Sequence, residues 1–244
     1  MSDNTTMSDN NATPDTTDLL DGLTPLVSRQ EWVIAQLGQS LDGRIATESG
    51  HSHYINGHES LVHLHRLRAL CDAVIIGAGT ASADNPQLTV RHASGANPVR
   101  VILDPRGRVP PTLTLFQDDA APTLHLLGPE VSLPAPAPHV RRQPLPLMAN
   151  GQFSPAAVIA HLKTRGYARI LVEGGGITVS QFIEAGVVER LHLLVAPLLI
   201  GSGRPGLAMT PIDTLATALR PRARRFSCGD DTLFDLCLNG PDTA

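Results

Sequence analysis

The chain contains few aromatic residues, a single lysine and few cysteines, and each shortage narrows what it can be. Phe, Trp and Tyr make up 3% of the 244 residues, so Val, Leu, Ile and Ala must build the core. Lys163 is the one lysine, which leaves one candidate for any chemistry that needs a lysine amine. Cys71, Cys228 and Cys237 show no C-x-x-C spacing, which argues against a zinc knuckle and a disulfide framework.

Charge and hydropathy exclude several classes of partner. The net charge of −4 gives no electrostatic reason to bind nucleic acid or an anionic membrane. No apolar run approaches the ~20 residues that a membrane span requires. The first residues, MSDNTTMSDNNATPDTTD, lack the basic and apolar regions of a secretory signal. Together with the cysteine pattern, these features predict a cytoplasmic protein without nucleic-acid or membrane partners.

Length and composition predict one folded domain behind a disordered tail. Residues 1–28 are rich in Asp, Asn, Thr and Ser and have little apolar surface to bury, so we expect disorder there. Residues 29–244 suffice for a single sizeable domain. The apolar run WVIAQL, which starts at Trp32, is expected to be its first buried strand.

Short apolar runs alternate with amphipathic segments, a pattern that predicts an α/β fold with a mixed, mainly parallel sheet flanked by helices. A helix is expected at 57–70, where Leu61, Leu64, Leu67 and Leu70 form an apolar stripe. Further strands are expected at 72–77, 98–104, 123–128, 139–145, 168–173 and 189–201.

Capping residues and turn residues predict the remaining elements. A second helix should start after the N-cap Ser154 and end before Gly166. A third helix should follow the glycines at 174–176. The chain should close with an antiparallel hairpin at 224–238, which turns at Gly229, Asp230 and Asp231.

A strand, three glycines and a helix follow one another in LVEGGGITVSQFIEAG, residues 171–186. Free backbone N–H groups and a helix N-terminus then lie beside a turn without side-chain bulk, which suits a pyrophosphate. The segment lacks the G-x-G-x-x-G fingerprint, so a Rossmann domain is not supported. Taken alone, a glycine-rich turn without a ligand explains the segment equally well.

Two further loops carry polar side chains after predicted strands. GAGTASADNPQLTVR, residues 77–91, offers Thr80, Asp84 and Arg91 around a tight glycine loop. Arg91 is a candidate ligand of a substrate phosphate, although the segment alone favours an exposed arginine at a strand start. SLDGRIATESGHSHYING, residues 40–57, has the density of polar side chains that is common in binding loops.

Six motifs in order resemble the reductase domain of the deaminase/reductases of riboflavin biosynthesis. They are SLDGRIA (40–46), GHSHYIN (50–56), HRLRA (65–69), GAGTASADNPQLTVR (77–91), DPRGRVP (104–110) and EGG (173–175). The downstream LHLLVAPLLIGSG also fits the family pattern. The resemblance runs from about Trp32 to the C-terminus, and on it the chain is identified as a member of this pyrimidine reductase family.

The resemblance implies a dihydrofolate-reductase-like fold, NADPH as hydride donor and a homodimer. It implies the reduction of 5-amino-6-(5-phosphoribosylamino)uracil, a phosphorylated pyrimidine whose ring-opened imine accepts hydride at the ribose carbon C1′ and becomes ribitylamino. The deaminase signature, H-x-E with a following P-C-x-x-C, is missing, so we expect no deamination.

The family motifs also imply roles for individual positions. Substrate-contacting positions are matched by Ser52, His53, Arg68, Leu88, Arg91 and Glu173. Cofactor-contacting positions are matched by Gly38, Tyr54, Thr80, Asp84, Pro105, Gly175, Gly176, Ile177, Thr178, Val179, Ser180 and Gln181. Arg106 and Arg108 are inferred to neutralise the 2′-phosphate of NADPH, because arginine forks suit phosphate. Glu173 is the predicted catalytic residue, which stabilises a developing iminium or steers a proton; the other interpretation is a carboxylate that only pairs with a nearby arginine.

The loop at 52–56 departs from the family pattern. Ser-His-Tyr-Ile-Asn stands where the family often has Ser-Lys-Trp-Ile-Thr. The change to His53 removes a permanent cation, because an unperturbed histidine is charged only below about pH 6.5. The exact pyrimidine therefore stays open. A reductase of another pteridine- or pyrimidine-like substrate and a non-catalytic NADPH-binding relic remain as alternatives.

A cluster of histidines raises the alternative of a metal enzyme. His58, Glu59 and His63 have one residue too many for H-E-x-x-H, so the two histidines would face different sides of a helix. His63 and His65 diverge in the same way. We therefore predict no metal site.

Overall fold

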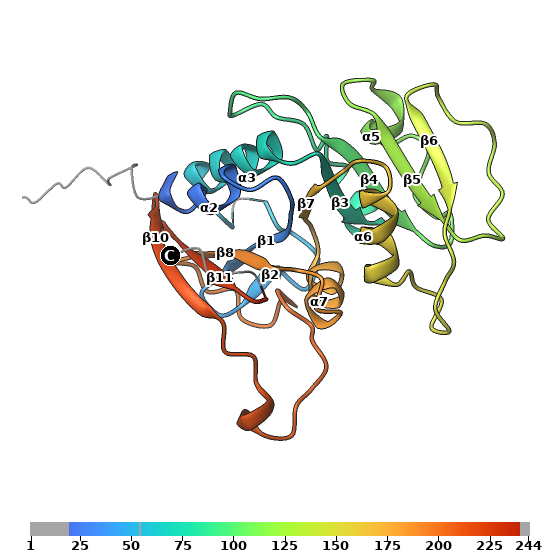
Figure 1. Ribbon diagram of the computed structural model, residues 1–244. Helices are drawn as coiled ribbons and strands as arrows, with labels where there is room; N and C mark the ends of the chain where they lie inside the picture. The colour runs from blue at the N-terminus through green and yellow to red at the C-terminus, as the bar shows by residue number, and fades with distance from the viewer. Residues whose placement is uncertain (1–19, 54, 240–244) are drawn as a thin grey trace, which may run out of the picture.

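In the computed structural model, which describes residues 20–53 and 55–239, a nine-stranded sheet forms the centre of the molecule. Its strand order is β10-β11-β8-β1-β7-β3-β4-β5-β6 (Figure 1). Neighbouring strands from β8 to β6 are parallel, and β11 and β10 are antiparallel additions at one edge. The predicted fold class, a mainly parallel sheet that ends in an antiparallel hairpin, is confirmed.

The predicted strands are all present. They are β1 (Trp32–Ser40), β3 (Ala73–Gly77), β4 (Val99–Asp104), β5 (Thr123–Leu127), β6 (Val140–Pro144), β7 (Arg169–Val172), β8 (Arg190–Ala196), β10 (Arg222–Cys228) and β11 (Asp231–Cys237). Side chains of β3 and β7 are buried on both faces, as expected for parallel strands between two layers of helices. A separate two-stranded sheet of β2 (Arg44–Ala46) and β9 (Arg204–Pro205) was not predicted.

Helices cover both faces of the sheet (Figure 1). α6 and α7 pack with Val33 and Ala35 of β1 on one face, and α2 to α5 pack around Trp32 and Ile34 on the other. The bounds are α2 (Thr24–Val27), α3 (His58–Leu70), α4 (Ala78–Asp84), α5 (Thr114–Gln117), α6 (Pro155–Lys163) and α7 (Gly176–Glu184). Among the described residues, no helix combines the length and apolar content that crossing a membrane requires.

Helix α3 is present as predicted, and the predicted apolar stripe makes up part of its buried face. Leu67 is fully buried, whereas Leu61 is 39% exposed and Leu64 and Leu70 are only partly buried. The rest of the buried face is polar and comprises Ser60, His63, His65 and Arg68. The predicted stripe is confirmed for Leu64, Leu67 and Leu70, which pack in the core. The polar part of the buried face was missed, because its side chains find partners on distant strands and loops.

The predicted disordered tail ends earlier than residue 28. Residues 24–27 form α2, in which Leu26 is 1% exposed. The carbonyl of Leu26 accepts a hydrogen bond from Nε1 of Trp32 at 3.1 Å, which joins α2 to the start of β1. Residues 1–19 of the predicted tail lie outside the described residues.

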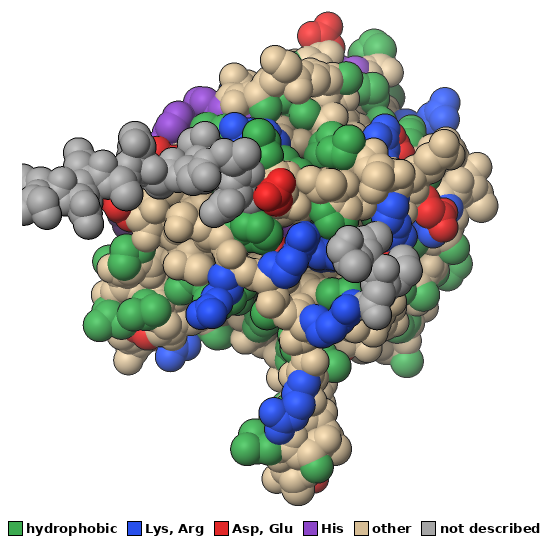
Figure 2. All heavy atoms as spheres, turned by 60° about the vertical axis from the view of Figure 1, so that its left-hand side comes forward, with side chains coloured by type: hydrophobic (Ala, Val, Ile, Leu, Met, Phe, Trp, Pro, Cys, Tyr) green, Lys and Arg blue, Asp and Glu red, His purple; other side chains and the backbone are tan. Residues whose placement is uncertain are grey.

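A long connection joins β9 to β10 and stands out from the body of the molecule (Figures 1 and 2). It contains a short 3₁₀ helix, Leu215–Thr217. Three of its large apolar side chains are exposed to solvent: Ile212, Leu215 and Leu219. We call residues 206–221 the arm.

Candidate active site

A cavity of about 860 Å³ lies at the carboxyl ends of β1, β7, β3 and β4. After β1, the chain builds β3, β4, β5 and β6 outward in one direction and then returns to place β7 between β1 and β3. Such a reversal of strand order leaves a crevice at the carboxyl ends, which is where open α/β sheets bind ligands. The volume is within the range of small-molecule and cofactor sites.

Most of the predicted site residues line this cavity. Those that do are Gly38, Ser52, Arg68, Thr80, Asp84, Leu88, Pro105, Arg106, Arg108, Glu173, Gly175, Gly176, Ile177, Thr178 and Gln181. His53, Arg91, Val179 and Ser180 are not part of its lining. Tyr54 lies outside the described residues. The structure therefore brings together predicted residues that are up to 143 positions apart in the chain, from Gly38 to Gln181.

The glycine turn after β7 packs against the helix that follows β3. Gly174 has a φ of +104°, a conformation that favours glycine, and a Cβ there would lie 2.9 Å from Thr80. The Oγ1 of Thr80 accepts the backbone N–H of Gly175 at 2.8 Å. A Cβ on Gly176 would collide with the carbonyl oxygen of Gly206. Close packing against Thr80 and Gly206 thus requires glycine at 174 and 176, and the turn lines the cavity at the N-terminus of α7, which has no acidic residue in its first turn.

Helix α7 presents only part of its first two turns to the cavity. Ile177, which is 68% exposed, and Gln181 line it. Val179 is fully buried in the core, and the Oγ of Ser180 accepts the N–H of Ala208 at 2.8 Å. Successive residues of a helix point about 100° apart, so the side chains of Val179 and Ser180 turn away from the cavity. The predicted cofactor contacts of residues 175–181 stay a prediction.

A buried ion pair joins α3 to the end of β7 at the cavity wall. Arg68 donates from Nε and Nη2 to the two carboxylate oxygens of Glu173, both at 2.7 Å. Arg68 also donates from Nη1 to the carbonyl of Thr89 at 3.2 Å. Burial alone would lower the pKa of Arg68, but the Glu173 carboxylate outweighs burial and raises it. The pair is therefore charged, and both predicted members touch the cavity.

The segment between α4 and β4 holds a strained residue against the cavity. Leu88 is 1% exposed and has a φ of +54°, which is unfavourable for a side chain of this size. Three residues later, Arg91 is exposed, and its Nη1 donates to Gln87 and Thr89 at 2.7 and 2.8 Å. Leu88 is thus part of the wall, whereas the Arg91 guanidinium sits outside it.

The loop before α3 is fastened to the hairpin at the far end of the chain. Asp231 accepts hydrogen bonds from Asn56 Nδ2, from the N–H of Gly57 and from Ser60 Oγ. The Asn56 side chain covers Gly38, where a Cβ would meet its Oδ1. This contact explains why glycine stands at the end of β1. Asp231 had been predicted only as a turn residue.

Asp84 faces charged groups of two other segments across the cavity mouth. Desolvation raises its pKa, and His53 and the guanidinium of Arg204 oppose this rise without cancelling it. Arg204 was not predicted as a site residue, although it lines the cavity from β9. No motif signals its role, because its place depends on the antiparallel pairing of β9 with β2.

Other lining residues were also missed by sequence reasoning. They include Gln36, Asp104, Gln152 and Phe153. Asp104 could have been found, because a carboxylate that ends an apolar strand is a common sign of a site at the carboxyl edge. Gln152 and Phe153 precede α6 in a segment where proline and polar residues give no such signal.

The histidine cluster is dispersed by the fold. His63 Nε2 lies 2.9 Å from Nδ1 of His192, whereas Nδ1 of His65 accepts the N–H of Arg91 at 2.9 Å. Burial beside Arg68, Arg91 and His92 lowers the pKa of His65 to about 4. In the part of the chain that the structure describes, no group of three or more His, Cys, Asp or Glu residues could hold a metal ion.

Comparison with protein families and curated proteins identifies relatives along most of the chain. The sequence model of one family, described as the RibD C-terminal domain, matches residues 31–226. A protein of Methanothermobacter thermautotrophicus named 2,5-diamino-6-ribosylamino-4(3H)-pyrimidinone 5′-phosphate reductase is 33% identical over 220 residues. That alignment covers 86% of this chain and 99% of the relative.

Two longer relatives match over part of their length. The riboflavin biosynthesis protein RibD of Synechocystis sp. is 31% identical over 215 residues, which cover 86% of this chain and 57% of that protein. The crystal structure of a Thermotoga maritima diaminohydroxyphosphoribosylaminopyrimidine deaminase/5-amino-6-(5-phosphoribosylamino)uracil reductase superposes with a TM-score of 0.72 at 25% identity. It is matched over 89% of this chain and 60% of its own. The chain thus spans less than two thirds of either longer relative.

Proposed function

Because the chain belongs to the family of RibD C-terminal domains, we propose that it is an NADPH-dependent oxidoreductase of riboflavin biosynthesis. Its proposed substrate is 5-amino-6-(5-phosphoribosylamino)uracil, which it reduces at the ribose carbon C1′ to the ribitylamino product. The observation that carries the proposal is the charged Glu173–Arg68 pair beside an open glycine turn in one cavity.

The residues around the glycine turn fit a dinucleotide. The N-terminus of α7 and the side-chain-free turn at 174–176 suit a pyrophosphate, because a helix N-terminus offers N–H groups and a positive dipole end. Arg106 and Arg108 line the cavity after β4 and would neutralise the 2′-phosphate. When bound, NADPH supplies the hydride, and the protein orients the two reacting carbons and excludes water.

Glu173 acts on the charge that develops at the reacting carbon. Arg68 fixes both carboxylate oxygens, yet each oxygen keeps a further lone pair that can face the cavity. In this position the carboxylate stabilises the positive charge of the ring-opened imine and holds the proton at its nitrogen. One such group typically contributes about 10²–10⁴-fold to the rate.

A second candidate substrate is the pyrimidine that still carries the amino group at ring carbon 2. It is favoured by the match to the M. thermautotrophicus protein, whose name specifies the 2,5-diamino compound and whose length is covered almost completely. The two pyrimidines differ at one exocyclic group, and no described residue of the cavity yet distinguishes them.

NADPH oxidation by the purified protein, followed with both pyrimidines in parallel, tests the proposal. Rapid turnover of the uracil compound supports the first substrate, and preference for the diamino compound supports the second. Tight NADPH binding without turnover of either compound would overturn the proposed reaction. It would favour one of the two alternatives: a reductase of another pteridine- or pyrimidine-like substrate, or a non-catalytic NADPH-binding relic.

The proposal includes a homodimer in the cytoplasm. The exposed apolar side chains of the arm and the exposed Leu198 and Leu199 offer surface that a second copy could bury. Cys71 and Cys228 are buried thiols that form no disulfide, as expected in a reducing compartment. Sedimentation at several protein concentrations tests the oligomeric state.

A further inference from the structure

Asp104 is the last residue of β4, and its buried carboxylate organises the loop that follows. It is 1% exposed and accepts the backbone N–H groups of Arg108 at 2.9 Å and Val109 at 3.0 Å. Burial alone would raise the pKa of Asp104, but His125 and the two backbone N–H groups outweigh burial and lower it. The carboxylate is therefore ionised and acts as an acceptor for the loop.

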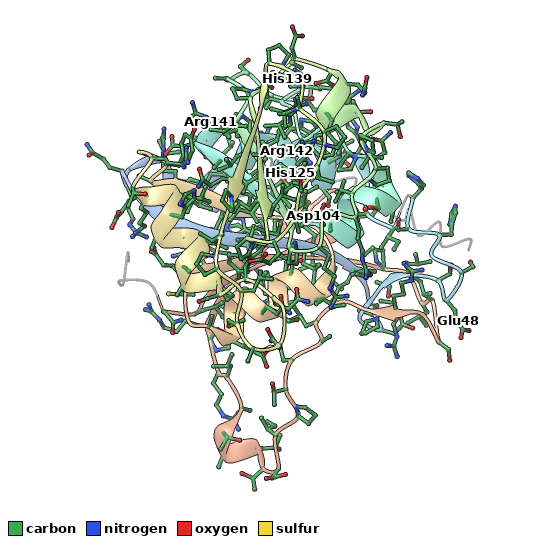
Figure 3. The ribbon with its side chains drawn as sticks, turned by 90° about the vertical axis from the view of Figure 1, so that its right-hand side faces the viewer. Glu48, Asp104, His125, His139, Arg141 and Arg142 are labelled. Carbon is green, nitrogen blue, oxygen red and sulfur yellow. The ribbon has the colours of Figure 1, made fainter. Side chains whose placement is uncertain are left out.

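His125 of β5 completes this arrangement from the neighbouring strand (Figure 3). Its Nε2 lies 3.1 Å from Oδ2 of Asp104, and the ring is 1% exposed. The other ring nitrogen, Nδ1, is buried without a hydrogen-bond partner among the described residues. Phe116 packs against the ring at a centroid distance of 4.9 Å. The contact with Asp104 is thus the polar interaction that orients the buried imidazole.

The loop held by Asp104 has little freedom elsewhere. Gly107 has a φ of +64°, and a Cβ there would collide with the side chain of Val131. A Cβ on Gly128 would collide with the carbonyl oxygen of Pro105. These close approaches pack residues 105–109 against the segment after β5, so the loop and the strand that carries His125 form one packed unit.

Two arginines project from this unit and line the cavity. Arg106 and Arg108 are both exposed, and within residues 20–53 and 55–239 neither guanidinium forms an ion pair. Two cations that lie two positions apart in the chain and line one cavity are suited to a doubly charged phosphate. Their spacing depends on the turn at Gly107, which Asp104 closes.

We propose that Asp104 and His125 are positioning residues that set Arg106 and Arg108 and thereby determine the preference for NADPH over NADH. This inference rests on the proposed cofactor. Neither residue needs to touch the nicotinamide or the pyrimidine. The pair acts through the loop, and its effect is confined to the 2′-phosphate that distinguishes the two cofactors.

The test compares the dissociation constants of NADH and NADPH, measured by titrating nicotinamide fluorescence with the full chain. His125→Phe fills the space beside Phe116 but donates no hydrogen bond, and it should weaken NADPH about tenfold more than NADH. His125→Gln keeps an N–H donor and should recover part of the preference. Asp235→Asn, which alters a buried carboxylate far from the cavity, should leave the ratio of the two constants unchanged.

A variant that lacks both arginines tests whether His125 acts on cofactor preference through them. Arg106→Ala combined with Arg108→Ala should abolish the preference, and adding His125→Phe should then change the ratio no further. An unchanged ratio in His125→Phe, or a further fall in the doubly substituted background, would overturn the inference while leaving the proposed reductase intact. A wild-type protein that binds neither cofactor would overturn the proposed function itself. Binding is measured without pyrimidine, so the result does not depend on which compound is reduced.

Discussion

The cavity and the sheet end formed by β8, β11 and β10 each contain a buried carboxylate paired with arginine, but only one of the two pairs can reach a ligand. Glu173 comes directly after β7 and lines the cavity with Arg68. Asp235 lies in the middle of β11, where Nη1 of Arg190 binds both of its oxygens at 2.6 and 2.7 Å. Strands flank β11 on both sides. The place of an ion pair along a strand therefore decides whether it can take part in chemistry.

The carboxylate of Asp235, in the enclosed pair, also has more hydrogen-bond partners than that of Glu173. Asp235 receives Nε and Nη2 of Arg224 in addition to Arg190, and His192 Nε2 lies 3.5 Å away. Burial alone would raise the pKa of Asp235, but His192 and Arg190 outweigh burial and lower it. The carboxylate of Glu173, by contrast, is bonded by Arg68 alone among the described residues, and it has an open side. The enclosed carboxylate stabilises the fold, and the open one is available to a substrate.

Glu173→Gln should have the largest effect on activity. The amide keeps the shape of the side chain but removes the negative charge that faces the imine, so turnover should fall about 10²–10⁴-fold. The dissociation constant of NADPH should change much less, because the proposed sites of the cofactor phosphates are at α7 and in the loop after β4, not at Glu173. Steady-state kinetics and fluorescence titration measure the two quantities. Equal losses in turnover and NADPH affinity would show that Glu173 only pairs with Arg68 and has no catalytic role.

Asp235→Asn should have the largest effect on stability. It leaves the buried Arg190 without its counter-charge, a change that typically costs about 3–5 kcal/mol. Denaturant unfolding measures the loss, and turnover of the folded protein should stay close to that of the wild type. A fall in turnover as large as that of Glu173→Gln would contradict the inference that Asp235 stabilises the fold and takes no part in the reaction.

The same residue predicts how stability depends on pH. The folded-state pKa of Asp235 is lower than its unfolded value, so its contribution is complete above the unfolded pKa and is lost as pH falls. The wild type should therefore lose stability below about pH 4. Asp235→Asn should show a shallower loss over this range. If the free energy of unfolding of the two proteins depends on pH in the same way, Asp235 does not cause the loss of stability at low pH.

The fold was predictable wherever local signals decide the structure. The apolar runs of β1, β3 and β4 and the caps of α6 were placed correctly, and Ser154 Oγ accepts the N–H of Ala157 at 3.4 Å. The polar part of the buried face of α3 was not predictable in this way. His63 meets His192 across 129 positions of sequence, and Arg68 meets Glu173 across 105. Polar side chains look exposed until their distant partners are known.

The site was predictable where family motifs lie at strand ends. Thr80, Glu173 and the glycines at 174–176 fall at one edge of the sheet because their strands are parallel neighbours. Arg204 was missed because its position depends on a tertiary pairing with β2. Val179 lies within the linear motif, but its side chain is buried in the core, because a helix turns its side chains away from a single surface.

Asp231→Ala should have an intermediate effect, because this residue links the hairpin to the cavity. It accepts hydrogen bonds from the loop at 56–57 and from Ser60 of α3, and leaving such buried donors unsatisfied typically costs about 1–3 kcal/mol. The release of Asn56 from Gly38 should raise the dissociation constant of NADPH a few-fold. Asp231→Asn, which retains one acceptor oxygen, should show smaller changes in both measurements. Equal effects of the two substitutions would contradict a hydrogen-bonding role.

Arg91→Ala should have the smallest effect of the four substitutions. Its guanidinium is exposed and bonded to Gln87 and Thr89, so any contact with the substrate phosphate is screened by water. We expect the KM for the phosphorylated pyrimidine to rise a few-fold. The dephosphorylated compound is the matched control, since its KM should not distinguish the variant from the wild type. An unchanged KM for the phosphorylated compound would mean that Arg91 does not bind the substrate phosphate. A cation that lines the cavity would then be the better candidate, and Arg204→Ala would test it.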